Sequence, residues 1–258
     1  MENLTEQEKA KLYEEVYPIA LKFRRTFISE KEVIKDTFKM IEQLGFLLLR
    51  FPAIEENTAL SGFTIHKEPY DCIYINSRQN LGRQYMSCWH ECYHIYTGEG
   101  SGISYVDSGK RDPIEYKADM FAGLILMPEN LVKEYIESRN ISLAYLSYED
   151  IIRMQNHFRV GYSAMLLRIL QIYPMYKKTL QNRFAIAKDH PDQREKLKKK
   201  TLSVQGDLRL INATNDIYIP DSFMNDIEFN VREKRISKEK AYELLKVIDG
   251  LGNDISWN

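Results

Sequence analysis

The chain has 258 residues, which is enough for one large domain or two small ones with a substantial hydrophobic core. Its 36 Lys and Arg against 37 Asp and Glu leave a formal net charge of −1, so there is no overall basic excess for nucleic acid or an anionic membrane. The chain has only three cysteines and begins with polar residues, and it contains no apolar run near the roughly 20 residues that span a bilayer. We therefore expect a cytoplasmic protein.

Helix signals come first along the chain. Thr5 and Glu8 have the spacing of a capping box, which predicts a helix that continues to about Phe27. The same spacing recurs at Ser29 and Glu32 and predicts a second helix, which ends at the next glycine. Its inward apolar side at three- and four-residue spacing consists of Val33, Ile34, Phe38, Ile41 and Leu44.

Strand patterns follow the second helix. Residues 46–51 predict a buried strand, and residues 62–66 and 72–76 predict a β-hairpin. Residues 87–96 then contain no Pro or Gly and lie just before Gly98, which predicts a helix that stops at glycine.

This last helix carries the motif His-Glu-Cys-Tyr-His at residues 90–94. Residues four apart on a helix lie about 40° apart around its axis, so His90 and His94 can direct both imidazoles at one metal ion. Glu91 would overlook that ion from the side, where a base for a bound water is needed. The alternative without a metal site is an exposed helix that happens to carry two histidines. An apolar side made of Cys88, Trp89, Cys92, Tyr93 and Tyr96 favours burial, and buried histidines need partners.

A further helix is expected over residues 112–126, with Asp112 as its N-cap and Pro113 in the first position. Glu115 lies in its first turn and would be a third metal ligand, which leaves a fourth position for water. Taken alone, a carboxylate in this place would more often be merely solvated. Asp119 lies one turn further on and could accept the outer N–H of a ligating histidine.

Other zinc patterns do not fit the residues. A third histidine ligand downstream would need Gly at position 97 and His at position 100, where the chain has Thr97 and Gly100. Cys88 and Cys92 lie about 200° around the helix from the two histidines and face the core. The Gly- and Ser-rich segment 98–111 is equally consistent with a mobile lip over the cleft and with a plain connecting loop.

The second half of the chain is expected to be mostly helical. Helices are predicted near residues 129–140, 147–157, 163–173, 221–233 and 237–249. The charged stretch 188–200 is interpreted as a linker, with a solvated helix as a close alternative. Residues 208–211 and 217–219 predict a small hairpin. This C-terminal tail could bind a partner, although packing on the rest of the chain is the commoner case.

Taken together, these motifs resemble the ImmA/IrrE-type metallo-endopeptidases over residues 44–168. Besides the histidine motif within RQYMSCWHECYH, the similar stretches are LSGF at 60–63, IYINS at 73–77, EYKADMFAGLILMP at 115–128 and FRVGYSAMLLR at 158–168. The stretch at 115–128 is similar to the family pattern ExxAxxFAxxLLMP, which is far more specific than HExxH. Two departures are Gly161, where the family usually has Ser, and Cys92-Tyr93 in place of small or aliphatic residues.

The resemblance implies that His90, His94 and Glu115 bind one Zn²⁺, with Mn²⁺ as an alternative, and that Glu91 is catalytic. It also implies an α+β fold: a mainly helical zincin-like metallopeptidase domain with a small antiparallel sheet, a helix-turn-helix-like segment and a small C-terminal α/β tail. Family members of this kind cut or inactivate repressors of the helix-turn-helix class. The expected function is therefore cleavage of such a repressor, which relieves repression of stress or mobile-element genes.

We expect residues 1–28 to form an N-terminal helix and residues 29–174 to form the peptidase domain, including a helix-turn-helix-like segment at 147–173. Residues 175–206 are expected to be a charged connector, and residues 207–258 the C-terminal hairpin and helices.

Two details of substrate handling are also expected. An edge strand near residues 61–66 would align an extended substrate, and the oxyanion donor would be one of Arg83, Tyr93, Tyr96, Tyr105 and His66.

Two rival functions remain from the sequence. The stronger is a non-proteolytic antirepressor that binds the repressor and in which the zinc is structural or sensory, although a purely structural site does not need Glu91. The weaker is direct nucleic-acid binding through residues 158–168. It is not expected, because Arg153, Arg159 and Arg168 are too few for a phosphate-binding surface on a neutral chain.

Overall fold

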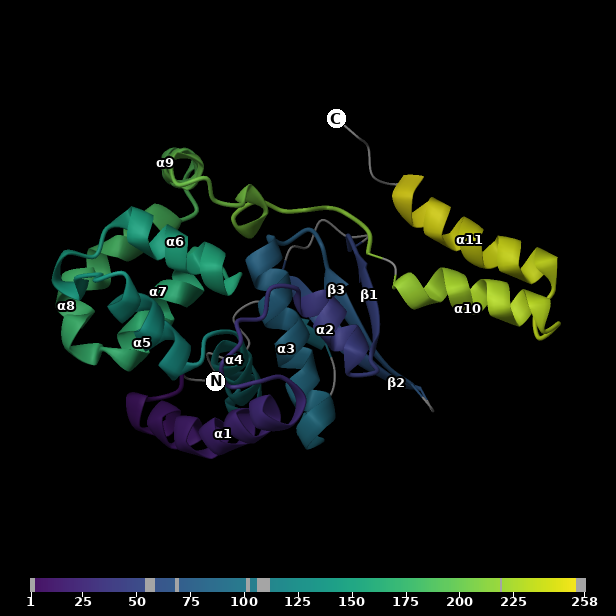
Figure 1. Ribbon diagram of the computed structural model, residues 1–258, viewed down its shortest axis with the longest axis horizontal. Helices are drawn as coiled ribbons and strands as arrows, with labels where there is room; N and C mark the ends of the chain where they lie inside the picture. The colour runs from purple at the N-terminus through teal and green to yellow at the C-terminus, as the bar shows by residue number, and fades with distance from the viewer. Residues whose placement is uncertain are drawn as a thin grey trace.

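The fold comes from a computed structural model, which describes residues 3–53, 59–67, 70–100, 103–105, 112–218 and 220–253. Figure 1 shows a mainly helical molecule with one small sheet. The strands are β1 (Leu47–Phe51), β2 (Leu60–Lys67), β3 (Tyr70–Asn76) and β4 (Ile103–Tyr105). The α-helices are α1 (Glu6–Phe27), α2 (Thr37–Gln43), α3 (Leu81–Thr97), α4 (Pro113–Leu126), α5 (Glu129–Ser138), α6 (Tyr148–Phe158), α7 (Tyr162–Ile172), α8 (Lys177–Leu180), α9 (Pro191–Ser203), α10 (Asp221–Arg232) and α11 (Lys238–Asn253).

The sheet has four strands in the order β1-β3-β2-β4. β2 and β3 form the predicted hairpin, and β4 pairs antiparallel with β2. β1 instead runs parallel to β3, with Leu48 opposite Ile73, so the prediction of an antiparallel sheet is wrong at this edge. β3 runs antiparallel to β2 on one side and parallel to β1 on the other, so the sheet is mixed. In this register both Leu48 and Ile73 are fully buried.

Helix α3 joins the sheet to the helical part of the molecule. It packs against β2 and β3 on one side and against α4 on the other, and α1 covers α4 (Figure 1). The Asn80 side chain caps the start of α3, and Gly98 ends it in the left-handed conformation with a φ of 70°. A Cβ at Gly82 would lie 2.4 Å from the backbone nitrogen of Gly161, so only glycine lets α3 approach the turn before α7 this closely.

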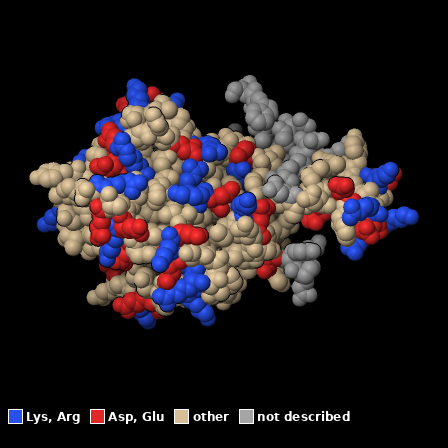
Figure 2. Space-filling view, in the orientation of Figure 1, with Lys and Arg blue, Asp and Glu red and all other residues tan. Residues whose placement is uncertain are grey.

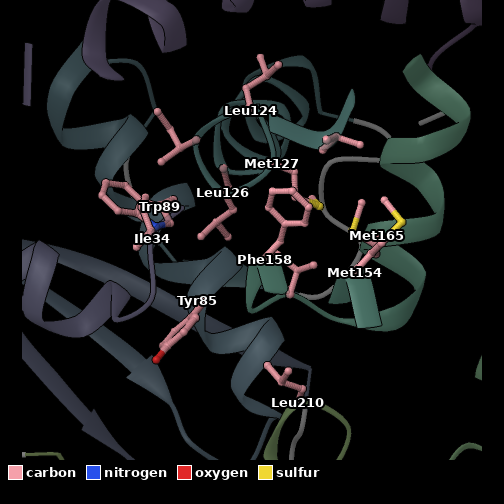
Figure 3. Close-up of a cluster of buried hydrophobic side chains, with 14 of the residues drawn as sticks. Ile34, Tyr85, Trp89, Leu124, Leu126, Met127, Met154, Phe158, Met165 and Leu210 are labelled. Carbon is pink, nitrogen blue, oxygen red and sulfur yellow. The ribbon is translucent and has the colours of Figure 1, made fainter. Parts of the chain in front are cut away.

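The main hydrophobic core lies where α3 and α4 meet α6 and α7, as Figure 3 shows. Trp89 of α3, Phe158 of α6 and Met165 of α7 are fully buried there. The indole N–H of Trp89 donates to the hydroxyl of Thr37 at 3.2 Å, so its one polar atom is satisfied. Truncation of a ring in such a core costs about 3–5 kcal/mol. This packing fixes the position of α3 and thus of the histidine motif.

The two capping-box predictions have different outcomes. The first is confirmed, because Thr5 and the N3 glutamate exchange both hydrogen bonds and α1 runs to the predicted end. The second is wrong. Ser29 and Glu32 direct their carbonyl oxygens at the buried guanidinium of Arg24, and α2 begins later, behind its N-cap Asp36. A buried cation requires such acceptors, so the chain wraps around Arg24 instead of adding helical turns.

The predicted helices α5, α6, α7, α10 and α11 are all present, but the chain between α7 and α10 differs from expectation. Most of the predicted charged linker is helix α9, so the alternative interpretation holds there. Residues 208–210 form a 3-10 turn rather than a strand. The helix-turn-helix-like character of residues 147–173 stays a prediction.

Residues 211–218, which we call the C-terminal strap, pair with distant backbone instead of forming the predicted hairpin. The N–H of Asn215 donates to the Ser77 carbonyl at 2.8 Å, and the N–H of Tyr218 donates to the Arg50 carbonyl at 2.9 Å. These bonds use backbone groups that a local hairpin would need. Residue 219, the end of the predicted hairpin, lies outside the described residues. Beyond the strap, α10 and α11 form a helical pair that projects from the body (Figure 1).

Within the described ranges, no helix combines the length and the apolar character needed to cross a membrane.

Candidate metal centre

The candidate site lies between α3 and α4. His90 and His94 are one turn apart on α3 and are both 6 % exposed, and Glu115 faces them from the first turn of α4. The structure therefore brings together the three residues that the sequence nominates as ligands. Together they form a group of side chains that could hold a metal ion.

The ligand atoms have the separations that a tetrahedral ion requires. The two Nε2 atoms lie 3.2 Å apart. Oε2 of Glu115 lies 3.3 Å from Nε2 of His90, and Oε1 of Glu115 lies 3.4 Å from Nε2 of His94. Ligand bonds of about 2.0–2.1 Å in a tetrahedron place neighbouring ligand atoms roughly 3.3–3.4 Å apart. The spacing of the three side chains thus fits one Zn²⁺-sized cation.

Both imidazoles are oriented by hydrogen bonds at their outer nitrogens. Nδ1 of His90 lies 2.9 Å from a carboxylate oxygen of Asp119, and Nδ1 of His94 lies 2.7 Å from the carbonyl oxygen of Glu99. An ionised carboxylate and a carbonyl can only accept, so each Nδ1 carries the proton and donates it. This leaves the lone pair of a neutral ring on Nε2, on the side of the other ligands.

Burial and the nearby carboxylates shift the two imidazoles in opposite directions. Burial opposes protonation of His90, but its hydrogen bonds to Asp119 and Glu115 outweigh this and raise its pKa to about 10. Burial lowers the pKa of His94 despite its hydrogen bond to Glu99. Near neutral pH the metal-free protein therefore carries a second proton on His90, at Nε2, whereas His94 is neutral, and a cation bound there would displace that proton.

Glu91 lies beside this group and is fully buried. Neither of its carboxylate oxygens has a hydrogen-bond partner among the described residues. Burial raises the pKa of Glu91 to about 7. His90 and the nearby Ser104 hydroxyl, which lies outside good hydrogen-bonding geometry to the carboxylate, act in the opposite direction. A buried carboxylate without donors is costly, and such groups are concentrated at functional sites.

Strands β2 and β4 close the site from the sheet side. A Cβ at Gly62 of β2 would lie 2.7 Å from the Tyr74 carbonyl and 3.3 Å from Oε1 of Glu91, so glycine leaves room for the carboxylate. The Ser104 hydroxyl of β4 lies 3.2 Å from Nε2 of His90. The prediction of an edge strand near residues 61–66 is wrong for its first part. Over residues 60–63, β2 is an inner strand of the sheet and β4 is the outer one.

The segment 98–111 is therefore not a plain loop in its described part, since it contains β4. The expected lip otherwise falls on residues 101–102 and 106–111, which lie outside the described residues.

Two of the oxyanion-donor candidates, Tyr93 and His66, have their polar groups engaged elsewhere, and the ring of a third packs against α1. The Tyr93 hydroxyl donates to the Glu99 carboxylate at 2.7 Å. The Tyr96 ring packs edge-on against Phe23, and His66 pairs with Asp71 on an exposed part of the hairpin. Of the remaining two, Arg83 lies in the first turn of α3, about two turns from His90. The Tyr105 side chain lies outside the described residues.

Four residues at the site were not singled out from the sequence, namely Gly62, Glu99, Gly100 and Ser104. Glu99 and Gly100 follow the helix-ending glycine, and that position was a usable signal that they lie near His94. Gly62 and Ser104 reach the site only through strand pairing between distant segments, which no local pattern reveals.

The profile of the peptidase M78 family, described as the IrrE N-terminal-like domain, matches residues 41–170. This match covers 130 of the 258 residues and includes all three candidate ligands and Glu91. The chain belongs to this family. Membership in the M78 peptidases supports a metallopeptidase activity, and a peptidase acts on protein substrates. No curated protein matches the chain.

Proposed function

We propose that this M78 family member is a zinc-dependent endopeptidase, with His90, His94 and Glu115 as metal ligands and Glu91 as the catalytic base. The observation that carries the proposal is that His90, His94 and Glu115 converge, with their nearest ring nitrogens and carboxylate oxygens 3.2–3.4 Å apart. Beside them lies a buried carboxylate that has no partner in hydrogen-bonding geometry in the described part of the chain. Mn²⁺ is the alternative ion, because imidazole and carboxylate ligands accept both.

A bound Zn²⁺ would polarise the scissile carbonyl and lower the pKa of water at the site toward neutrality. Glu91 would accept a proton from the attacking water and then deliver it to the leaving amine. Burial raises the pKa of Glu91 in the metal-free protein, and a raised pKa favours a carboxylate that both takes and returns a proton. Asp119 and Glu99 hold the two imidazoles in the tautomer that the ligand role requires.

The proposed substrate is a helix-turn-helix repressor, by resemblance to the ImmA/IrrE-type peptidases. An extended segment of it would add to the sheet beside β4, since no strand pairs with the outer side of β4 among the described residues. This arrangement brings the peptide next to Ser104, whose hydroxyl lies close to His90.

The second candidate is a non-proteolytic antirepressor that only binds the repressor. An ion with a structural role needs its ligands to be positioned, which Asp119 and Glu99 achieve, but it does not need Glu91. In an antirepressor, the energetic cost of burying Glu91 without a hydrogen-bond donor would serve no function. This argument favours the endopeptidase.

Nucleic-acid binding is not part of the proposal. Arg168 is 2 % exposed and donates to the Met127 carbonyl, and Arg159 pairs with Asp207 at 2.9 Å. On the face shown in Figure 2, cationic and anionic side chains are interspersed. Neither feature favours a phosphate-binding surface.

The proposal is tested by incubating the purified protein, loaded with Zn²⁺, with the repressor-like protein encoded beside it. Wild type should generate discrete fragments that disappear with a chelator. Glu91→Gln should still bind zinc stoichiometrically but should cut at least 100-fold more slowly, because general-base catalysis is worth 10²–10⁴-fold. His90→Ala should lose both metal and activity. Equal cleavage by wild type and Glu91→Gln would refute the role of Glu91, and repressor binding without fragments would favour the antirepressor.

A further inference from the structure

The two candidate ligand histidines are held in different ways. His90 is held by a side chain, Asp119 of α4, whereas His94 donates to the main-chain carbonyl of Glu99 at 2.7 Å. Residue 99 lies between Gly98 and Gly100, which both have a φ of 70°. Glycine is the residue with the greatest backbone freedom, so the local backbone alone does not keep this carbonyl in place.

The Glu99 N–H donates to the Thr97 hydroxyl at 3.2 Å, and the side chain of Glu99 supplies a second, stronger restraint. Its carboxylate accepts a hydrogen bond from the Tyr93 hydroxyl at 2.7 Å and another from the Lys117 ammonium at 3.2 Å. Tyr93 is fully buried on α3, and Lys117 lies on α4, so both donors belong to rigidly packed helices. Lys117 also pairs with Glu15 of α1 at 3.1 Å, which restrains the ammonium group further.

We propose that Glu99 is a positioning residue: its side chain, held by Tyr93 and Lys117, fixes its own carbonyl so that His94 presents the lone pair of Nε2 to the metal. This inference rests on the proposed function, because it assigns Glu99 a role at the same centre. Without the carboxylate anchors, the segment between the two glycines would move and the acceptor of the His94 Nδ1 proton would be lost for part of the time.

A purely stabilising role would not explain this arrangement. The Glu99 carboxylate is 40 % exposed and that of Glu15 is 43 % exposed, and ion pairs this accessible contribute little to the free energy of unfolding. Both anchors are hydrogen bonds to the Glu99 carboxylate, and the one from Tyr93 is the shorter, with a donor residue that is fully buried. In agreement, the hydrogen bond from Tyr93 lowers the pKa of Glu99, with a further contribution from Lys117, while burial and Glu99 raise the pKa of Tyr93. Loss of a residue that orients a ligating histidine typically weakens metal binding 10–100-fold.

The first test reads the tautomer of His94 directly and needs neither metal nor substrate. Long-range ¹H–¹⁵N spectra of the metal-free protein at pH 8 distinguish Nδ1–H from Nε2–H, and the chain has only five histidines to assign. Wild type should show His94 as Nδ1–H. Glu99→Ala and the double variant Tyr93→Phe/Lys117→Met should show a mixture of tautomers, while His90, held by Asp119, should be unchanged.

The second test measures Zn²⁺ affinity by competition with a chelating dye. Glu99→Ala and Tyr93→Phe/Lys117→Met should bind zinc at least 10-fold more weakly. The single variant Lys117→Arg should bind zinc with an affinity within about threefold of wild type, because arginine keeps the positive charge and the hydrogen-bond donor.

The controls remove equivalent contacts elsewhere. Tyr162→Phe deletes a buried hydroxyl that donates to the Arg183 carbonyl, and Lys200→Met deletes a half-buried ion pair with Glu149. Both should leave zinc affinity and the His94 tautomer as in wild type. If the Glu99 and Tyr93/Lys117 variants only melt earlier, with wild-type tautomer and affinity, the inference is refuted. A failure of the protein to cut any repressor would leave both measurements unaffected, so the two proposals fail separately.

Discussion

The guanidinium of Arg50 on β1 forms two hydrogen bonds with the carboxylate of Asp216 in the C-terminal strap, at 2.6 and 2.9 Å. The Arg50 side chain is only 6 % exposed, and it also donates to Gln84 at 3.0 Å and lies over the ring of Phe38. A strap that comes after the family domain thus supplies the counter-ion of a buried cation within that domain. The strap is therefore an integral part of the fold.

Removal of that counter-ion should destabilise the whole domain. Asp216→Asn should lower the free energy of unfolding by about 1–3 kcal/mol, because the buried charge of Arg50 would lose its counter-ion. Urea denaturation at pH 7 measures this. Asp192→Asn is a suitable control, since Asp192 is 86 % exposed and lies 3.7 Å from His190; it should change the midpoint little. Identical midpoints for the two variants would contradict an integral strap.

Replacement of Glu91 should have opposite effects on activity and stability. Glu91→Gln removes a buried charge that has no hydrogen-bond donor among the described residues, and an amide costs less to bury than a carboxylate. The metal-free variant should therefore melt at a higher temperature than metal-free wild type, by an amount equivalent to roughly 1 kcal/mol or more. Differential scanning calorimetry with chelator present measures this. A lower melting temperature would show that Glu91 makes a stabilising contact.

Gly98 and Gly100 provide a matched pair of variants. Both have a φ of 70°, so alanine is strained at either position, at about 1–2 kcal/mol. A Cβ at Gly98 would meet nothing within 4 Å, whereas one at Gly100 would lie 2.9 Å from Nδ1 of His94. Gly100→Ala should therefore weaken zinc binding at least 10-fold, while Gly98→Ala should mainly lower stability. Zinc titration of the two proteins compares them directly. Equal affinities would mean that the His94 ring does not depend on contact with Gly100.

His157 should make the stability of the protein depend on pH. Burial, together with the charges of Lys35 and Arg139, lowers the pKa of His157 to about 4. The unfolded chain has a pKa near 6.5, so between roughly pH 6.5 and 4 it binds more protons than the folded chain. The contribution of His157 to stability should therefore fall as the pH falls through this window, by less than about 3 kcal/mol because the ring is partly exposed. Glu91, whose pKa is raised, contributes in the opposite direction.

The matched variants for this prediction are His157→Gln and His190→Gln. His157→Gln should shift the difference in urea midpoint between pH 6.5 and 4 toward greater stability at the lower pH, because the destabilising protonation of His157 is removed. His190 is 62 % exposed, so its replacement should leave the slope as in wild type. An unchanged slope in His157→Gln would assign the pH dependence to other groups.

The local signals in the sequence predicted those parts of the fold that depend on neighbouring residues. Helix α3 stops at Gly98, and α4 starts behind Asp112, as their caps predict. The pairing of His90 with His94 follows from helical periodicity alone. Glu115 required a second motif, because nothing within α3 specifies which carboxylate completes the group.

The predictions failed where distant groups decide the structure. The Ser29 and Glu32 spacing is a valid capping pattern, but the buried Arg24 takes the carbonyls of both residues. The strap forms no hairpin because its backbone pairs with segments more than 130 residues earlier, such as Asn215 with Ser77. β4 escaped notice for the same reason, since its pairing with β2 defines it.

The two acceptors that orient the candidate ligands differ in whether a substitution can remove them. One base change can replace Asp119 and delete the acceptor for His90, but no substitution at position 99 deletes a peptide carbonyl. The acceptor for His94 is thus guaranteed by the backbone, and only its placement is open to variation. Substitutions at position 99 should accordingly reduce metal binding in steps of different size, whereas any substitution of Asp119 that removes its acceptor should cause the full loss at once.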